Sequence, residues 1–277
     1  MAGNVFGNPI TDDIVRLIYP GVSEITPKLR AKVAFQYINA DGRDVNCKNF
    51  VHNLKQRYGS GISSLCMIFN ATGRSLTYVG NKDWNGQIYE SPYPSLLQNG
   101  QWGAFLHTRP KVSLRGSQGA VVYRGQNNAG VPSDWMLAWS IPRIGHNSVS
   151  RAYLVVVRLN VAHVMENNVG QFTRTGIAYT EIRKAHHYEA DHWAYIKGLL
   201  ESKPTYYTGT WNGCYSAVTI GRGTSPEYVG IMSLDGVISE LSYAVFMSLA
   251  ASSAIEDSAV EDSAIEDSDA EGKEDEE

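Results

Sequence analysis

The segment from residue 116 to residue 142 constrains the fold of this chain more than any other part. It holds two runs with the composition of β-strands, residues 119–124 and 134–141, on either side of a polar turn that contains Asn, Gly and Pro. In the second run both alternating sets of side chains are largely apolar: Trp135, Leu137 and Trp139 on one face, Met136 and Ala138 on the other. The pattern predicts a central strand that is covered on both faces. It ends at Pro142, because proline lacks the backbone donor that strand pairing needs.

Short strand-like runs separated by polar turns continue from residue 63 to residue 234. The expected strands are residues 64–70, 75–79, 102–107, 119–124, 134–141, 178–183, 214–220 and 228–234. Turns are expected where Gly follows Asn or Thr, at residues 71–73, 85–86, 98–100 and 212–213. Many short strands at this spacing predict a mostly β (α+β) fold built on a β-sandwich.

Residues 1–60 show helical spacing instead, and we expect helices that flank the sandwich. Thr26 is a candidate N-cap because Pro27 follows it at the first helical position. A second helix is expected to begin after an N-cap at Asp44. A third helical run, residues 191–201, carries three apolar residues on one face: Trp193, Ile196 and Leu200.

Charge is divided unevenly along the chain. The net charge of −4 combines −11 in residues 253–277 with +7 in residues 1–252. The acidic end repeats a unit of Ser-Ala-Ile/Val-Glu-Asp, whose period fits neither helix nor strand, so a disordered acidic tail is expected. The basic body favours an anionic surface such as phospholipid or nucleic acid, or it is an ordinary solvated surface.

Several short motifs together resemble a known plant family. They are V-F-G-N-P-I-T (residues 5–11), Y-G-S-G (58–61), F-N-A-T-G (69–73), S-P-Y-P (91–94), N-G-Q-W-G-A-F (99–105), D-W-M-L (134–137), Y-T-E-I (179–182), W-N-G-C (211–214) and T-S-P (224–226). This block is similar to the plant 23-kDa jasmonate-induced proteins. It covers about residues 5–234. The G-A-V strand, the polar turn and S-x-P resemble the actinoporin-like domain, of the type found in a sphingolipid-binding mushroom protein family (Nakanori-type).

The resemblance implies an actinoporin-like β-sandwich flanked by helices, in a stress-responsive protein that binds without catalysis. In actinoporins the serine and proline of S-x-P help to form a phosphocholine pocket that tyrosines complete, and Ser140 and Pro142 match those two positions. The match is incomplete, since residues 143–148 carry no aromatic side chain and the corresponding helix offers only Trp193 and Tyr195. Alternatively, S-I-P only terminates a strand.

A second candidate site is a set of loops that contains Trp84, Tyr89 and Tyr93 among Asn, Gly and Pro. Aromatic side chains in such loops suit contact with a lipid head group or stacking on a glycan, and they also close the end of a sandwich without any ligand. We expect a lipid head group or glycan to be recognised at this aromatic loop end. A soluble lectin-like module, or an RNA- or ribosome-associated regulator that uses the basic body, is the alternative.

Catalysis is not expected, because the chain has no nucleophile elbow, phosphate-binding loop or dinucleotide fingerprint. The His, Glu and Asp side chains of residues 186–192 match no familiar metal spacing, so neither a metal nor another cofactor is expected. Three cysteines are too few for a disulfide framework, and Cys66 and Cys214 are expected as buried thiols. No signal peptide or membrane span is evident, which favours a cytoplasmic, or possible nuclear, location.

The expected organisation is a helical segment, residues 1–60, packed on a sandwich of residues 61–240, with the acidic tail at residues 253–277. Residues 151–175 interrupt this plan with an apolar, β-branched run, where we expect a short connection from the family pattern. The run is either an added hairpin or edge strand, or a translated non-coding segment. We expect it to pack poorly against the core.

Overall fold

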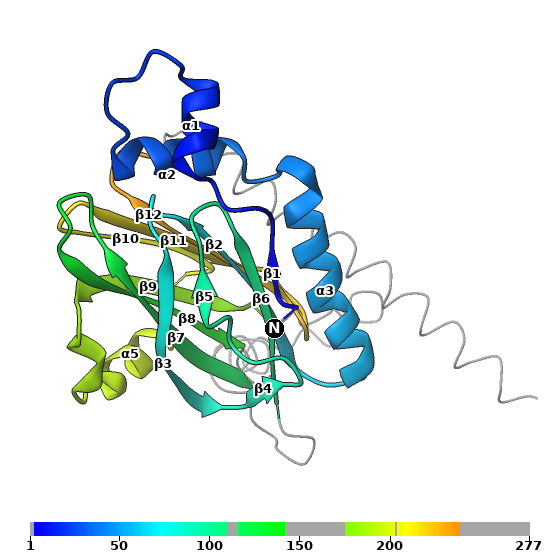
Figure 1. The fold of residues 1–277 in the computed structure, drawn as a ribbon. Helices are drawn as coiled ribbons and strands as arrows, with labels where there is room; N and C mark the ends of the chain where they lie inside the picture. Colours follow the sequence, from blue (N-terminus) through cyan, green and yellow to red (C-terminus); the bar gives the residue numbers. More distant parts are fainter. Residues whose placement is uncertain (1–2, 110–115, 142–174, 203, 239–277) are drawn as a thin grey trace, which may run out of the picture.

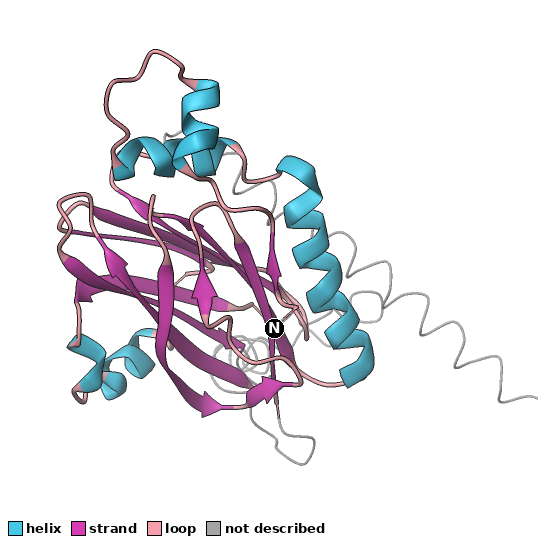
Figure 2. Ribbon diagram, viewed as in Figure 1, coloured by secondary structure: helices cyan, strands magenta, loops and turns pink. Residues whose placement is uncertain are grey.

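The computed structural model describes residues 3–109, 116–141, 175–202 and 204–238. In these residues two β-sheets lie against each other, and helices cover their outer faces (Figures 1 and 2). The helices are α1 (Asp12–Ile18), α2 (Pro27–Gln36), α3 (Arg43–Tyr58) and α5 (Trp193–Leu199), with the 3-10 turns η1 (Ala40–Gly42) and η2 (His187–Glu189). The predicted mostly β sandwich with flanking helices is confirmed.

The larger sheet combines strands from both ends of the described chain. Its order is β1-β6-β2-β12-β11-β10, with β4 paired to β6. These strands are β1 (Val5–Phe6), β2 (Ser63–Ala71), β4 (Gln87–Tyr89), β6 (Trp102–Thr108), β10 (Tyr206–Trp211), β11 (Cys214–Ile220) and β12 (Glu227–Leu234). β12 runs parallel to β2, with Glu227 opposite Leu65 and Ser233 opposite Ala71, whereas the other described pairs in this sheet are antiparallel.

The smaller sheet has the order β5-β3-β7-β8-β9. Its strands are β3 (Leu76–Asn85), β5 (Leu96–Leu97), β7 (Ser117–Gln126), β8 (Pro132–Ile141) and β9 (Ile177–Lys184). β8 lies between β7 and β9, so both of its edges are hydrogen-bonded. All of its residues after Pro132 are buried, which confirms the predicted strand covered on both faces.

Three apolar layers hold the sheets and helices together. One cluster lies between the two sheets and includes Phe105, Trp135 and Trp139. A second lies between the larger sheet and α2 and α3. The third lies on the outer face of the smaller sheet, where Met136 and Ala138 of β8 meet Ile196 of α5. The side chains of β8 therefore contribute to two of the three layers.

The cysteine side chains lie inside these layers. Cys66 and Cys214 are buried in the cluster between the sheets, as the sequence predicts, and Cys47 is buried in α3. Burial raises the pKa of the Cys214 thiol to about 11, so this thiol stays protonated at neutral pH.

The structure contains each expected strand and three expected helices, with differences in their bounds. The N-cap prediction at Asp44 is wrong: the N-cap is Gly42, two residues earlier, and Asp44 lies in the first turn of the helix. The sequence analysis also did not predict α1, β1, β4, β5 or β10. Two- and three-residue strands carry too few side chains to show alternation, which accounts for three of these omissions.

The cap of α2 has the predicted chemistry. Thr26 Oγ1 accepts a hydrogen bond from the Leu29 amide at 3.2 Å, with Pro27 at the first helical position. We expect Thr26→Ala to lower the free energy of unfolding by about 1 kcal/mol, because a first-turn amide loses its acceptor. Thr11→Ala is the matched control, since Thr11 caps α1 without a side-chain hydrogen bond. Equal losses in chemical denaturation would show that the Thr26 cap contributes nothing.

Residues 151–175, the tail at residues 253–277 and Pro142 lie outside the described residues, apart from Thr175. The predictions about them, and the domain boundaries at residues 60 and 240, stay predictions. The ends of the connection between β8 and β9 are nevertheless placed: Ser140 pairs with Ile177. Because both ends are fixed side by side, added length in this connection leaves the strand register intact at a modest entropic cost.

Candidate functional site

The structure separates the three aromatic residues that the sequence suggested as one exposed loop site. Tyr89, on β4, packs edge-on against Tyr58 of α3 at a ring-centroid distance of 5.3 Å. Tyr93 stacks on Tyr78 at 5.5 Å at the margin of the core between the sheets. Trp84 is on β3 and packs on the outer face of the smaller sheet. The three side chains are half-buried in three different layers, so the interpretation as one exposed surface is wrong.

The Tyr93 hydroxyl also has a hydrogen-bond partner. It donates a hydrogen bond to Asp83 Oδ1 at 3.1 Å. Burial first, and then the charge of Asp83, raise the pKa of the Tyr93 hydroxyl, which therefore stays protonated. A side chain held in this way supports the fold, and its truncation would not be a specific test of binding.

The structure does bring two of the candidate residues, Trp84 and Trp193, into contact. Trp84 meets Trp193 of α5 edge-to-face at 6.1 Å, and Trp193 lies 5.6 Å from the ring of Tyr188 of η2. Tyr195 follows on the solvent side of α5, with 62% of its surface exposed. Tyr179 of β9 belongs to the same apolar layer. We call these five residues the outer aromatic cluster.

Ser140 is on the same outer face of the smaller sheet but is not exposed. It lies at the end of β8, opposite Gln118 of β7, and is only 5% exposed. The Gln118 side-chain oxygen accepts a hydrogen bond from Asn85 Nδ2 at 2.9 Å, which ties β7 to the strand that carries Trp84. Ser140 therefore lies at the margin of the aromatic layer. The predicted pairing of Ser140 with Pro142 stays a prediction.

The segment that covers the outer face, residues 186–200, is called the helical cap below. It lies against small side chains, Ala120 of β7 and Ala138 of β8, which let it approach the sheet closely. Ile196 and Leu200 are buried in this contact, as their helical spacing predicts. Burying each of these side chains contributes about 1.5–3 kcal/mol, enough to hold a seven-residue helix that would not form alone.

A buried carboxylate supports the cluster from below. Glu181 of β9 accepts hydrogen bonds from the hydroxyls of Tyr179 and Tyr188, each at 3.0 Å, and from Arg183 at 2.9 Å. Burial, followed by the charge of Glu181, raises the pKa of both tyrosines, so both remain donors. Sequence reasoning missed this arrangement. The alternation of Tyr179 and Glu181 along one strand was the available signal.

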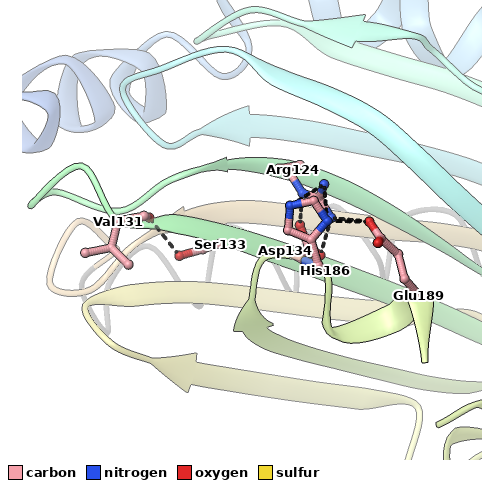
Figure 3. A network of polar contacts seen from close by, with 6 residues as sticks. All are labelled: Arg124, Val131, Ser133, Asp134, His186 and Glu189. Carbon is pink, nitrogen blue, oxygen red and sulfur yellow. Dashed lines mark hydrogen bonds and ion pairs between the residues drawn. The ribbon is translucent and has the colours of Figure 1, made fainter. Parts of the chain in front are cut away.

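The start of the cap is fixed by a second polar network (Figure 3). Arg124 of β7 forms two hydrogen bonds to Asp134 of β8, at 2.7 and 2.9 Å, and contacts Glu189 at 3.2 Å. Asp134 also accepts the backbone amide of His186 at 2.9 Å, and the His186 ring lies 2.6 Å from Glu189. Hydrogen bonding to Asp134 raises the pKa of Arg124 further, so its positive charge is permanent.

One further constellation resembles catalytic chemistry. Ser117 Oγ lies 2.8 Å from His107 Nδ1, and His107 Nε2 lies 3.4 Å from Asp83 Oδ1. Ser117 and His107 are both fully buried, so no substrate reaches the hydroxyl. Ser64 lies 2.8 Å from the same hydroxyl, and the group joins β2, β6, β7 and β3 in the interior. These contacts account for the arrangement as a structural one.

Among the described residues there is neither a metal-binding group of side chains nor a membrane-spanning helix. Within them, no three His, Cys, Asp or Glu side chains are grouped closely enough to hold a metal ion. No helix in that part of the chain has the length and apolar character to cross a bilayer. The outer aromatic cluster is thus the strongest candidate site, and it offers aromatic faces and an exposed tyrosine hydroxyl.

Comparisons with known proteins agree with the fold. A family model for Nakanori-like proteins matches residues 4–155. The "23 kDa jasmonate-induced protein" of Hordeum vulgare is 39% identical over 234 residues, covering 83% of this chain and 98% of the barley protein. A "jasmonate-induced protein homolog" of Atriplex canescens is 38% identical over 80 residues, 29% of this chain and 42% of that protein. The solved structure of the lipid binding protein Nakanori superposes with a TM-score of 0.65 at 21% identity, covering 83% of this chain and 99% of Nakanori.

Proposed function

Since this chain belongs to the Nakanori-like family and to the family of the 23 kDa jasmonate-induced protein, we propose that it is a stress-responsive protein that binds a membrane-lipid head group without catalysis. The proposed site is the outer aromatic cluster. The description of Nakanori as a lipid binding protein supports this choice over a glycan or a nucleic acid.

The contact between Trp84 and Trp193 is the observation that carries the proposal. It joins a strand to a helix that lies more than a hundred residues away in the sequence, and it leaves both rings half-buried. Tyr195, two residues after Trp193 on α5, is exposed. Tryptophan and tyrosine are the side chains that favour the boundary between water and lipid, because their rings are apolar and their polar atoms remain wet. Their π-faces also attract a quaternary ammonium such as the choline of a zwitterionic head group.

The test is co-sedimentation of the full chain with vesicles of phosphatidylcholine, with and without sphingomyelin and anionic lipid. We expect Trp84→Ala and Tyr195→Ala to weaken vesicle binding by about tenfold each, the effect of losing one aromatic contact of about 1.4 kcal/mol. Tyr19→Ala is the matched control, because Tyr19 is 37% exposed but lies at the end of α1, far from α5 (Figure 1).

Three results would contradict the proposal, and each would point to a different conclusion. Equal binding by wild type, Trp84→Ala and Tyr195→Ala would place lipid recognition elsewhere on the molecule. Binding to sugar arrays without any binding to vesicles would replace the proposal with a lectin-like function. Binding to RNA that weakens steeply with salt, without vesicle binding, would replace it with recognition by the basic body.

A further inference from the structure

We propose that two stacked histidines, His187 and His192, form a proton-sensitive latch that keeps the helical cap closed, and that acidification weakens lipid binding by opening it. The consequence for lipid rests on the proposed function, whereas the latch itself does not. The two residues close the turn between η2 and α5: His187 begins η2, and His192 is the N-cap of α5.

The geometry is that of two rings held face to face. Their centroids are 4.1 Å apart and the ring planes differ by 7°. The His187 ring also meets the ring of Tyr188 edge-on at 5.1 Å, which links the pair to the outer aromatic cluster. The turn between them is otherwise held by few backbone hydrogen bonds, among them His192 N to Ala190 O at 3.0 Å. Ring stacking is thus a main contact across this turn.

Protonation of both rings turns the attraction between them into repulsion. Neutral imidazoles attract each other when stacked, whereas two imidazolium rings at this distance repel. Burial first, and then the charge of His192, lower the pKa of His187 below its ordinary value. As pH falls through the range in which free histidine titrates, the open state therefore binds more protons than the closed state, and the closed state loses stability. At higher pH the stacked contact is intact and the cap stays closed.

Some of the surrounding charges raise the pKa of His187 and others lower it. Glu181 and Asp134 favour a proton on His187, and Arg183 opposes it, with smaller effects than burial and His192. Arg124 keeps its positive charge, because its hydrogen bond to Asp134 raises its pKa.

The remaining groups lie on the cap itself. His186 gains an attraction to Glu189 when protonated, which acts against opening, but these side chains are 65% and 63% exposed and water screens them. Asp191 is exposed beside His192. Repulsion between the closely stacked rings is therefore the larger effect.

The latch controls the proposed site because of where α5 begins. Trp193 follows His192 directly, and it is the residue that meets Trp84. A shift of His192 away from His187 moves Trp193 off its partner on β3 and separates the two halves of the binding surface. Lipid affinity is then expected to fall as pH falls. By linkage, bound lipid should in turn resist proton uptake by the pair.

Hydrogen–deuterium exchange of the full chain tests the latch without lipid. Peptides covering residues 186–200 are compared at about pH 7.5 and about pH 5, after correction for intrinsic exchange rates. We expect wild-type protection to fall by about tenfold at the lower pH. In His192→Gln, which cannot gain the second charge, the pH dependence should be clearly smaller, because only the burial of His187 still opposes its protonation. His52→Gln is the control, because His52 lies on α3 against Glu227.

The result that overturns the latch is wild-type protection that does not change with pH, or an equal change in His192→Gln. His192 is exposed, so the variant is expected to fold, and its melting temperature at neutral pH verifies this. Binding to phosphatidylcholine vesicles at the two pH values then tests the link to lipid. We expect affinity to fall about tenfold in wild type only. If no vesicles bind at either pH, the proposed function fails while the exchange result still decides the latch.

Discussion

Gly73→Ala is expected to lower the free energy of unfolding by at least about 4 kcal/mol, enough to leave little folded protein. Gly73 ends the turn between β2 and β3 with φ +74°, and a β-carbon there would overlap the backbone carbonyl of Pro27. The left-handed conformation alone costs a non-glycine residue about 1–2 kcal/mol. The overlap adds to this, because backbone cannot rotate away as a side chain can.

Movement at this point would also break contacts made by the turn itself. The Gly73 amide donates to Asn99 Oδ1 at 2.8 Å, and its carbonyl accepts from Arg30 Nε at 2.8 Å. Gly130→Ala is the matched control, since Gly130 has φ +81° but no atom within 4 Å of the added carbon. We expect it to cost only about 1–2 kcal/mol. Similar losses for both variants in chemical denaturation would show that conformation, and not close packing on α2, decides the effect.

The second large effect is expected for Glu181→Ala, which should lower the free energy of unfolding by about 3–5 kcal/mol. Truncation removes the acceptor of two buried tyrosine hydroxyls, Tyr179 and Tyr188, and leaves Arg183 without its partner. Each buried hydroxyl that loses its partner costs about 1–3 kcal/mol. The variant should also lose protection from hydrogen exchange in the helical cap, since Tyr188 connects the cap to β9.

Glu189→Ala is the control for this prediction. Glu189 also lies in the cap and pairs with Arg124 and His186, but its side chain is 63% exposed. Water screens an exposed ion pair, so the expected loss is small. Thermal denaturation that shows equal shifts for Glu181→Ala and Glu189→Ala would contradict the role given to the buried carboxylate.

Sequence patterns were sufficient for the elements whose side chains alternate or repeat over several residues. β8 is the clearest example, because a strand with two apolar faces is stable only when both faces are buried, and both faces of β8 are. β11 was predicted with its observed bounds, residues 214–220. The strand before it, β10, was missed, although the Asn212-Gly213 turn favours a two-stranded hairpin and therefore indicates a strand on each side.

The candidate site was less accessible to sequence reasoning. Trp84, Trp193 and Tyr195 were identified by residue type, but nothing in the sequence states that Trp84 and Trp193 touch. Their contact depends on the pairing of β3, β7 and β8 and on the packing of α5, each of which joins distant segments. Tyr89 and Tyr93 share the same composition signal and turned out to be packing residues. Type alone therefore could not separate a surface aromatic from a buried one.

The parallel pairing of β2 with β12 has a consequence for how the chain is made. Residues 63–71 pair with β6 on one edge, but the partner for their other edge comes only at residues 227–234, so the ribosome must release nearly the whole described chain before the larger sheet closes. Until then β2 presents an open edge, which invites pairing with other nascent chains. A chain that stops before β12 should consequently aggregate, whatever it retains of the smaller sheet. Synthesis of this protein therefore depends on chaperones or on low local concentration for longer than its size alone implies.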